Sequence, residues 1–374
     1  MRKILSLFAF VAIVISFVAC GGNVPGGEEP EVPHFQFKVQ ILSTKAHVIV
    51  TPDTPNKAYF WWREKASTID AKQMTLQEYV EDYLSNKTYD EWYGSFILTK
   101  PDDFTMKSLD ADSKYIIYAF YVEKVGEDAK IVGNIESYEF TTLPEYTLNG
   151  EFSISDTKKV RFMSANMKKE SASSGLSFMS NQWEYKNSNS AYPRDLFQWE
   201  EAMNGFPSLV PYRILSASEW EYLFITRPDA KKLFAHATIL VNNVEKHGLI
   251  LLPDNWVTPD GIQLKTDHIL GFEWNQKDEC YQSVDYNLNG YEKNVYTTDQ
   301  WQTLEFAGAV FLPAPGYVSE DGTQQYLFMA GLYWSSTTGN DKAHYMVCRK
   351  NTIIPHYTYS TTPYISVRPV SDIK

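Results

Sequence analysis

The residues best suited to ligand contact lie near the end of the chain, where tyrosines alternate with small hydroxyl residues in segment 351–364. A tyrosine ring offers a large contact area at low entropic cost, and serine and threonine adapt their hydrogen bonds to a partner. We therefore expect a binding surface there. Its aromatic faces would come from Trp334, Tyr357, Tyr359 and Tyr364, and its orienting hydrogen bonds from Asn351 and His356. The same composition is also typical of an ordinary pair of β-strands.

A second pattern places oxygen-bearing side chains at alternate positions, Asp285, Asn287 and Asn289, followed by Gly290. This spacing matches the first half of an EF-hand-like calcium loop, in which the glycine permits a sharp turn. The twelfth position of such a loop is Tyr296 here, so the usual bidentate glutamate is missing. The alternative is an Asn-Gly hairpin turn, which needs no metal. Calcium is the one cofactor that the sequence suggests.

Other kinds of chemistry find little support in the sequence. The histidines lack the close spacing of zinc ligands, and there is no glycine-rich phosphate loop or nucleophile elbow. The formal net charge is -12 with no basic cluster, which argues against a nucleic-acid partner. Cys280 and Cys348 either form a disulfide or are small buried residues. We therefore expect a binding protein that is not an enzyme.

The elements of the first half are predicted to be mainly strands. Alternating apolar residues and β-formers mark strands at 35–41, 46–50, 59–62 and 137–142. Thr75 and Glu78 form a capping box in front of a stretch with one apolar face, which predicts a single inserted helix. We therefore expect a β-sandwich over residues 34–143, with the boundary at 143–145.

The second half, residues 148–374, mixes helices and strands. A hairpin is expected at 156–162. A capping box at Ser216-Glu219 begins one helix, and segment 297–300 begins another that stops at Gly308. Strands are expected at 248–253, 309–312, 333–334, 345–348 and 364–370. The whole chain is thus predicted to be α+β.

Several segments of residues 148–374 are similar, in order, to the Fibrobacter-type major paralogous domain. They are 180–185, 195–197, 213–223, 248–256, 307–316, 333–337 and 366–370. Segment 213–223 also resembles the signature helix of formylglycine-generating-enzyme-like proteins. The resemblance implies a C-type-lectin-like α+β fold whose last strands and loops present a variable binding face. In some related domains retroelements diversify this face, which we carry as a hypothesis for segment 351–364.

The resemblance does not imply the enzymatic activity of the oxygenase relatives. Oxygenase relatives hold copper with two nearby cysteines late in the chain, whereas the late region here has Cys348 alone. Residues 34–143 resemble an immunoglobulin-like sandwich of the fibronectin type III kind. In that resemblance Tyr115, which follows the segment 109–114, would bond back to the backbone at a corner between strands.

The beginning of the chain predicts export. An apolar run at 4–18 follows Arg2 and Lys3 and leads to Ala19, so residues 1–19 are expected to be a secretory signal peptide. Segment 17–20 resembles a bacterial lipobox, which implies that Cys20 carries the lipid. The Gly-, Pro- and Glu-rich residues 20–33 would be a flexible tether.

Together these features predict a lipoprotein of the cell envelope, held on the outer membrane through its lipid and exposed at the cell surface. Its lectin-like domain would recognise an extracellular glycan or protein. The alternative is a structural component of a surface complex for glycan uptake or of a surface fibre.

Overall fold

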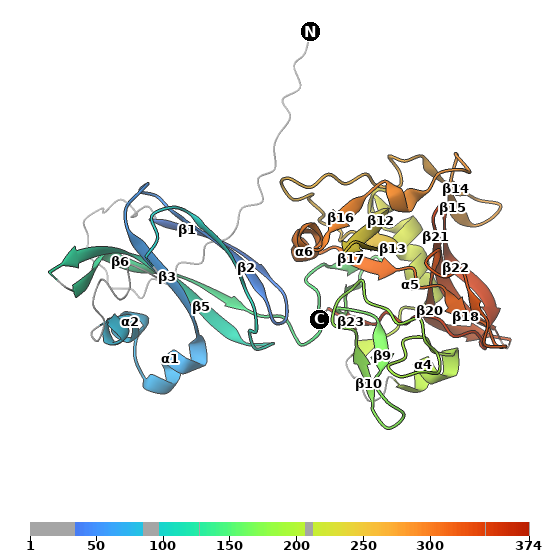
Figure 1. Cartoon of the computed structure of the whole chain (residues 1–374), viewed down its shortest axis with the longest axis horizontal. Helices are drawn as coiled ribbons and strands as arrows, with labels where there is room; N and C mark the ends of the chain where they lie inside the picture. Colours follow the sequence, from blue (N-terminus) through green and yellow to red (C-terminus); the bar gives the residue numbers. More distant parts are fainter. Residues whose placement is uncertain (1–33, 85–96, 127, 206–211, 341, 374) are drawn as a thin grey trace, which may run out of the picture.

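The computed structural model describes residues 34–84, 97–126, 128–205, 212–340 and 342–373. The expected signal peptide, Cys20 and the tether up to residue 33 lie outside the described residues. The described chain is an α+β fold dominated by strands, and the strands before residue 142 share no sheet with those after residue 151 (Figure 1). Within these ranges no helix has the length and apolar character needed to cross a bilayer.

Two three-stranded antiparallel sheets form the N-terminal part, in the orders β1-β2-β4 and β3-β5-β6. Their strands are β1 (Phe35–Ile41), β2 (Ala46–Pro52), β3 (Tyr59–Lys65), β4 (Asp102–Met106), β5 (Lys114–Val125) and β6 (Asp128–Thr141). Alternation turns Val48, Val50 and Ile117 into a core between the sheets. The strands predicted at 35–41, 46–50 and 59–62 are confirmed, whereas the last strand begins nine residues earlier than expected, at 128 instead of 137.

Two helices follow β3, α1 (Ala66–Lys72) and α2 (Leu76–Leu84). They cover the outer face of the β3-β5-β6 sheet, so the prediction of a single helix was wrong. The capping box of α2 is confirmed, because the Thr75 N–H donates to the Glu78 carboxylate at 2.7 Å and the Glu78 N–H donates to Thr75 Oγ1 at 3.2 Å. Helix α1 gives no such signal, since its N-cap Lys65 makes no side-chain cap bond and only Ile69 is buried.

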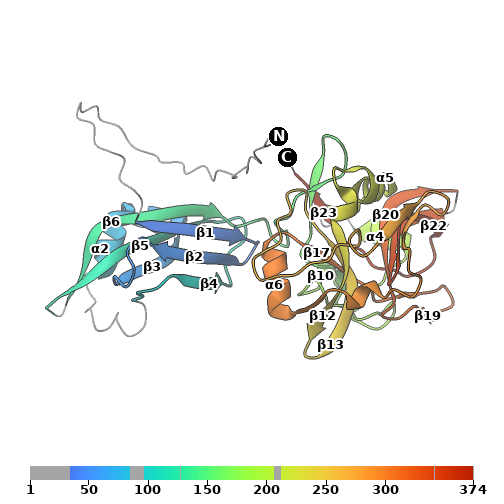
Figure 2. The same ribbon diagram turned by 90° about the horizontal axis from the view of Figure 1, so that it is seen from above.

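The corner before β5 forms as expected, with Tyr115 Oη accepting the backbone N–H of Asp110 at 2.9 Å. The N-terminal part also contacts the rest of the chain near this end. Leu42, in the turn between β1 and β2, is buried in a core cluster of the C-terminal part. The His47 ring of β2 lies 5.7 Å from the Phe306 ring at the end of α6, the helix on the side nearest β1 and β2 (Figure 2).

The C-terminal part contains five sheets, in the orders β11-β23-β8-β7, β16-β12-β13-β17, β14-β15-β22-β21-β20, β10-β9 and β18-β19. The strands are β7 (Phe152–Ser153), β8 (Lys159–Phe162), β9 (Met167–Lys169), β10 (Leu176–Phe178), β11 (Tyr212–Arg213), β12 (Phe234–Val241), β13 (Val244–Leu251), β14 (Phe272–Asn275), β15 (Cys280–Ser283), β16 (Val295–Thr297), β17 (Val310–Pro313), β18 (Tyr317–Val318), β19 (Gln324–Gln325), β20 (Ala330–Gly339), β21 (Lys342–Arg349), β22 (Thr352–Ser360) and β23 (Val370–Asp372). The helices are α4 (Trp199–Gly205), α5 (Ala217–Glu221) and α6 (Thr298–Phe306), with shorter turns η2 (Tyr222–Thr226), η3 (Ala230–Lys232) and η4 (Gly290–Glu292).

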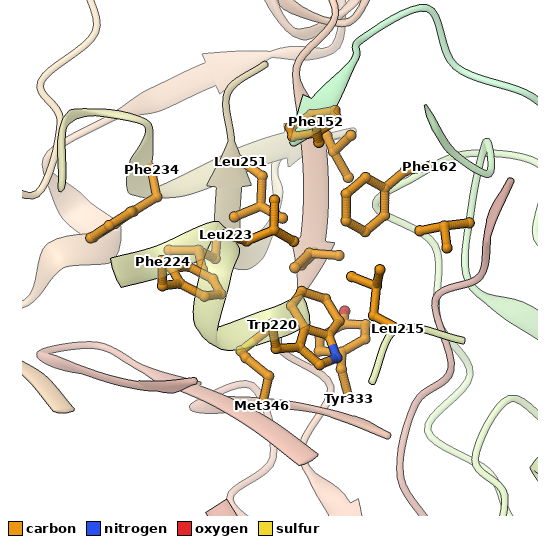
Figure 3. Packing of buried hydrophobic residues seen from close by; sticks show 14 of the residues in the cluster. Phe152, Phe162, Leu215, Trp220, Leu223, Phe224, Phe234, Leu251, Tyr333 and Met346 are labelled. Atoms are coloured by element: carbon orange, nitrogen blue, oxygen red, sulfur yellow. The ribbon is translucent and has the colours of Figure 1, made fainter. Parts of the chain in front are cut away.

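The core of this part is built around α5 and its π-helical continuation η2 (Figure 3). Trp220, Leu223 and Phe224 have no exposed surface and pack against side chains of the surrounding sheets. The predicted capping box holds the start of the helix, with the Ser216 N–H donating to the Glu219 carboxylate at 2.7 Å. The helix predicted to begin at 297–300 forms as α6, and a capping box at Thr297 holds its start.

A buried polar network ties distant segments of this part together. Arg368 donates to Gln182 Oε1 at 2.5 Å and to Asn166 Oδ1 at 3.3 Å. Gln182 also accepts the backbone N–H of Phe311 at 2.8 Å, and Tyr333 Oη lies 3.3 Å from the Asn166 amide. Burial lowers the pKa of the Arg368 guanidinium to about 10. The network explains why polar residues occupy core positions in several of the segments that carry the resemblance.

Two expectations for the end of the chain need correction. Segment 364–370 is not a strand throughout, because it makes single bridges at Tyr364, Ile365 and Ser366 before β23 begins. Cys280 and Cys348 are both buried and free, so of the two alternatives the disulfide is wrong. Burial raises the pKa of the Cys348 thiol to about 12.

Candidate ligand-binding surface

Tyrosines from three segments gather where β18, β21 and β22 meet. We call the surface formed by Tyr317, Tyr326, Arg349, Tyr357 and Tyr359 the tyrosine surface. Three of its rings are well exposed, Tyr326 at 46%, Tyr357 at 43% and Tyr359 at 57%. Such exposure is unusual for so many large rings in one place and favours contact with a partner.

Pairing of β21 with β22 sets the positions of Tyr357 and Tyr359. Tyr357 lies opposite Tyr345, and Tyr359 lies opposite Ala343. Paired residues point to the same face of a sheet, so both tyrosines face the same side. The Tyr345 ring, only 5% exposed, lies 5.4 Å from the Tyr357 ring and forms a floor beneath it.

An irregularity in β22 helps to aim these tyrosines. The register shifts between Tyr345 and Val347, because Tyr345 pairs with Tyr357 whereas Val347 pairs with Ile354. One extra residue of β22 is accommodated in this interval, which contains Pro355. Proline has no N–H for the ladder and is confined to edges and bulges, so its presence suits this position.

Strand β18 and the loop after β19 supply the other half of the tyrosine surface. The Tyr326 ring stacks on the Tyr317 ring at 6.1 Å, and the Arg349 guanidinium lies 5.0 Å from the centre of the Tyr326 ring. Tyr326 and Phe328 have φ of 50° and 59°, a left-handed conformation that is costly for bulky residues. Strain of this kind clusters at binding sites, where surrounding contacts hold it in place.

The pKa of the Tyr317 hydroxyl reflects the other members of the tyrosine surface. Burial raises the pKa of the Tyr317 hydroxyl, and the neighbouring hydroxyls of Tyr326, Tyr359 and Tyr357 raise it further, while Arg349 opposes them. The Tyr317 hydroxyl therefore stays protonated at neutral pH. Tyrosine hydroxyls can donate and accept hydrogen bonds beside flat aromatic faces, and one guanidinium adds a positive charge.

A buried histidine fixes the turn that carries Arg349. His236 Nδ1 lies 2.6 Å from the Asp267 carboxylate and His236 Nε2 lies 2.6 Å from the Arg349 carbonyl oxygen. Gly290 reinforces the turn by donating its N–H to the Lys350 carbonyl at 2.7 Å. Both ring nitrogens of His236 face acceptors and the side chain is fully buried, so it positions the turn and is closed to a substrate.

The structure separates the residues that the sequence grouped. Trp334 is fully buried and its indole N–H donates to the Phe197 carbonyl at 2.8 Å, so it cannot offer a ring to a ligand at this surface. This part of the prediction was wrong. Tyr364 is partly buried and pairs with Val318 next to Tyr317, which leaves it at the border of the tyrosine surface.

The two expected hydrogen-bonding residues also lie elsewhere. His356 precedes Tyr357 in the strand and therefore faces the opposite side of the sheet, where its ring lies 3.7 Å from the Glu279 carboxylate. Asn351 lies at the other end of β22, and its amide donates to the Tyr286 carbonyl at 3.3 Å. Neither side chain belongs to the tyrosine surface.

The polar side chains of loop 285–289 bond within the loop and to the turn that follows it. Asp285 accepts the Asn287 N–H at 2.9 Å, and the Asn289 amide donates to Glu292 at 2.7 Å. Gly290 begins the turn η4 rather than a hairpin, so the hairpin alternative was wrong. Among the described residues no group of three or more His, Cys, Asp or Glu side chains is placed to hold a metal ion. Calcium at Asp285, Asn287 and Asn289 stays a prediction.

A separate hollow of about 640 Å³ lies beside the start of α5. Its central cation, Arg213, donates to both Glu219 carboxylate oxygens at 2.8 Å and to Asp372 at 2.7 Å. These charges satisfy one another, so the hollow presents less free hydrogen-bonding capacity than its lining suggests. The tyrosine surface is therefore the better candidate for ligand contact.

Sequence reasoning missed Tyr317, Tyr326 and Arg349. Each is separated from segment 351–364 by turns whose direction the sequence does not encode in any simple pattern. The one signal was the high tyrosine content, twenty-five in the chain, of which a part had to be exposed. Comparison with models of known families, with curated proteins and with solved structures finds no match to this chain.

Proposed function

We propose that the protein is a lipoprotein of the cell surface that binds an extracellular glycan or protein through the tyrosine surface. The observation that carries the proposal is the grouping of Tyr326, Tyr357, Tyr359 and Arg349 about Tyr317, with three of the rings well exposed. Aromatic rings with hydroxyl groups supply both apolar and hydrogen-bonding contact, as in antibody binding loops.

The fold proposal has support from topology. A fibronectin-type-III-like sandwich for residues 34–143 is supported by two sheets of three strands, by their order β1-β2-β4 and β3-β5-β6, and by the Tyr115 corner. A C-type-lectin-like domain for residues 148–374 is supported by the late strands β20, β21 and β22, which carry the tyrosine surface. In this proposal the lipid on Cys20 holds the membrane side and the tyrosine surface meets the ligand.

The chemistry of the surface favours binding over catalysis. Its side chains are four phenols and one guanidinium. Nucleophilic catalysis needs a nucleophile within hydrogen-bond reach of a base, and the tyrosine surface as defined contains no base. We therefore place the protein among binding proteins.

The test begins with an array of glycans and extracellular proteins probed with the full-length chain. The double variant Tyr357→Ala/Tyr359→Ala should weaken binding to the identified ligand by at least about tenfold, because exposed tyrosines dominate contacts of this kind. The matched control is Tyr83→Ala, which removes a tyrosine that is 50% exposed on α2. Equal affinity of the double variant and the control would overturn the proposal.

A further inference from the structure

A second concave site lies over the β14-β15 hairpin, away from the tyrosine surface. It encloses about 520 Å³. Its lining combines two aromatic residues with amide, hydroxyl and charged side chains, namely Glu273, Trp274, Asn275, Gln276, Lys277, Gln282, Ser283, Val284 and Tyr286. β14 is an edge strand, so the site is open on that side.

The aromatic part of the lining combines an exposed ring with a packed one. Tyr286 is 75% exposed, and its backbone carbonyl accepts the Asn351 amide at 3.3 Å. Trp274 packs edge-on against the Tyr281 ring at 5.2 Å, and its indole N–H donates to Gln276 Oε1 at 3.2 Å. The Trp274 ring therefore keeps its position before any ligand arrives, and Tyr286 offers an exposed ring for contact.

The polar part of the lining is available. Within the described residues, the side chains of Glu273, Lys277 and Gln282 and the Tyr286 hydroxyl make no hydrogen bond to protein. Glu273 lies opposite Gln282, and Gln282 lies opposite Thr352, so these three residues point to one face of the sheet. An amide, a carboxylate and an ammonium group beside the exposed Tyr286 ring match the hydroxyls and C–H faces of a sugar.

The charged side chains of the lining indicate which class of ligand the pocket would bind. The lining holds one carboxylate, Glu273, and one ammonium group, Lys277, and these cancel. An anionic or cationic ligand would gain from one of them and be repelled by the other. We infer that this pocket, defined by Glu273, Gln282 and Tyr286, binds a neutral saccharide unit.

The same sheet face leads from the pocket toward the tyrosine surface. Thr352 lies opposite Arg349, whose guanidinium stacks on Tyr326. Neighbouring strands lie about 4.8 Å apart, so the row from Glu273 to Arg349 covers roughly 15 Å. The pocket stands without the proposed function, because it shares no lining residue with the tyrosine surface.

The test uses isotope-labelled full-length protein and follows the indole N–H signal of Trp274, assigned with the variant Trp274→Phe. The probes are the methyl glycosides of glucose, galactose, mannose and N-acetylglucosamine, with glucuronate as the anionic comparison. At least one neutral glycoside should shift the signal saturably with a millimolar Kd. Gln282→Ala and Tyr286→Ala should each weaken this binding at least about tenfold.

Tyr357→Ala is the matched control and should leave the titration unchanged, so failure of the pocket and failure of the tyrosine surface are distinguishable. Both pocket variants change exposed or half-exposed residues, and unchanged thermal unfolding will show that they fold. Absence of a saturable shift with every neutral glycoside, a response to glucuronate alone, or full binding in both pocket variants would each overturn the inference.

Discussion

Two arginines of the C-terminal part, Arg349 and Arg368, lie in opposite environments. Arg349 is exposed and stacks on Tyr326, where its charge faces solvent and any arriving ligand. Arg368 is 1% exposed and bonds to Gln182 and Asn166. A buried cation is stabilised only by the groups that surround it, so the second arginine depends on its network and the network depends on it.

Replacement of the buried arginine should therefore be costly. Arg368→Ala removes the hub of the network, leaves Asn166 Oδ1 buried without its donor and takes one of two donors from Gln182 Oε1, which should lower the free energy of unfolding by about 3–5 kcal/mol. The matched control Arg349→Ala should change the free energy of unfolding by less than about 0.5 kcal/mol. Chemical denaturation of both variants measures the difference. Equal stabilities would show that the network contributes little.

At the scale of elements, close backbone approaches decide where glycine is needed. Gly290 does not occupy a left-handed turn, since its φ is not positive. It lies against the packed histidine instead, because an added Cβ would come within 2.8 Å of both His236 Cβ and the Lys350 carbonyl oxygen. The glycine that suggested a metal loop is thus required by the contact that holds the turn between β21 and β22.

Gly290→Ala should push this turn away from β12 and reduce stability by about 1–3 kcal/mol, the usual cost of overpacking. Gly175→Ala is the control, because a Cβ added there meets nothing within 4 Å. Thermal unfolding compares the two variants. Gly290→Ala should also weaken ligand binding at the tyrosine surface through displacement of Arg349. A Gly290→Ala variant as stable as the control would contradict this account.

Elements were predictable from sequence where a local signal existed. Alternating residues marked β1 and β2, and capping boxes marked α2 and α5, because both signals operate within a few residues. Helix α1 lacked a capping side chain and was missed. Side-chain burial was harder to predict, since the alternation around Trp334 shows two faces and does not say which one meets the core.

The candidate site was predictable only in part. Tyr357 and Tyr359 are exposed as expected, whereas Asn351 precedes them by six and eight residues along an extended chain, which separates it from them by roughly 20–25 Å. Residues that are close in sequence are spread along an extended strand, and strand alternation places the His356 side chain on the opposite face of the sheet. Two partners of these tyrosines, Tyr317 in β18 and Tyr326 in the loop after β19, are brought near only by the tertiary fold.

At the scale of the whole molecule, the two parts of the chain are joined by a connector and by side-chain contact. Leu42 of the N-terminal part is 6% exposed and packs into the same cluster as residues of the C-terminal part. The Leu143 N–H also donates to the Leu42 carbonyl at 3.4 Å. A small apolar contact of this kind restrains the connector near the junction.

The proposed anchor is testable at this scale. Cys20→Ser removes the acceptor for the lipid, so the chain should move from the membrane fraction to the soluble fraction and lose labelling by fatty acid. Cys280→Ser is the matched control and should keep both properties, because its side chain is 5% exposed within the sheet. Fractionation and labelling of the exporting cells provide the measurement. Unchanged attachment of the Cys20→Ser variant would remove the anchor from the proposal.

The two buried thiols of the five-stranded sheet offer a way to follow opening of the folded state. Cys348 has no exposed surface, and burial raises the pKa of both thiols, so neither reacts as a thiolate in the native state. An alkylating reagent reaches Cys348 only in molecules whose strands have parted. The rate at which Cys348 is alkylated therefore measures how often the sheet opens, without any added probe.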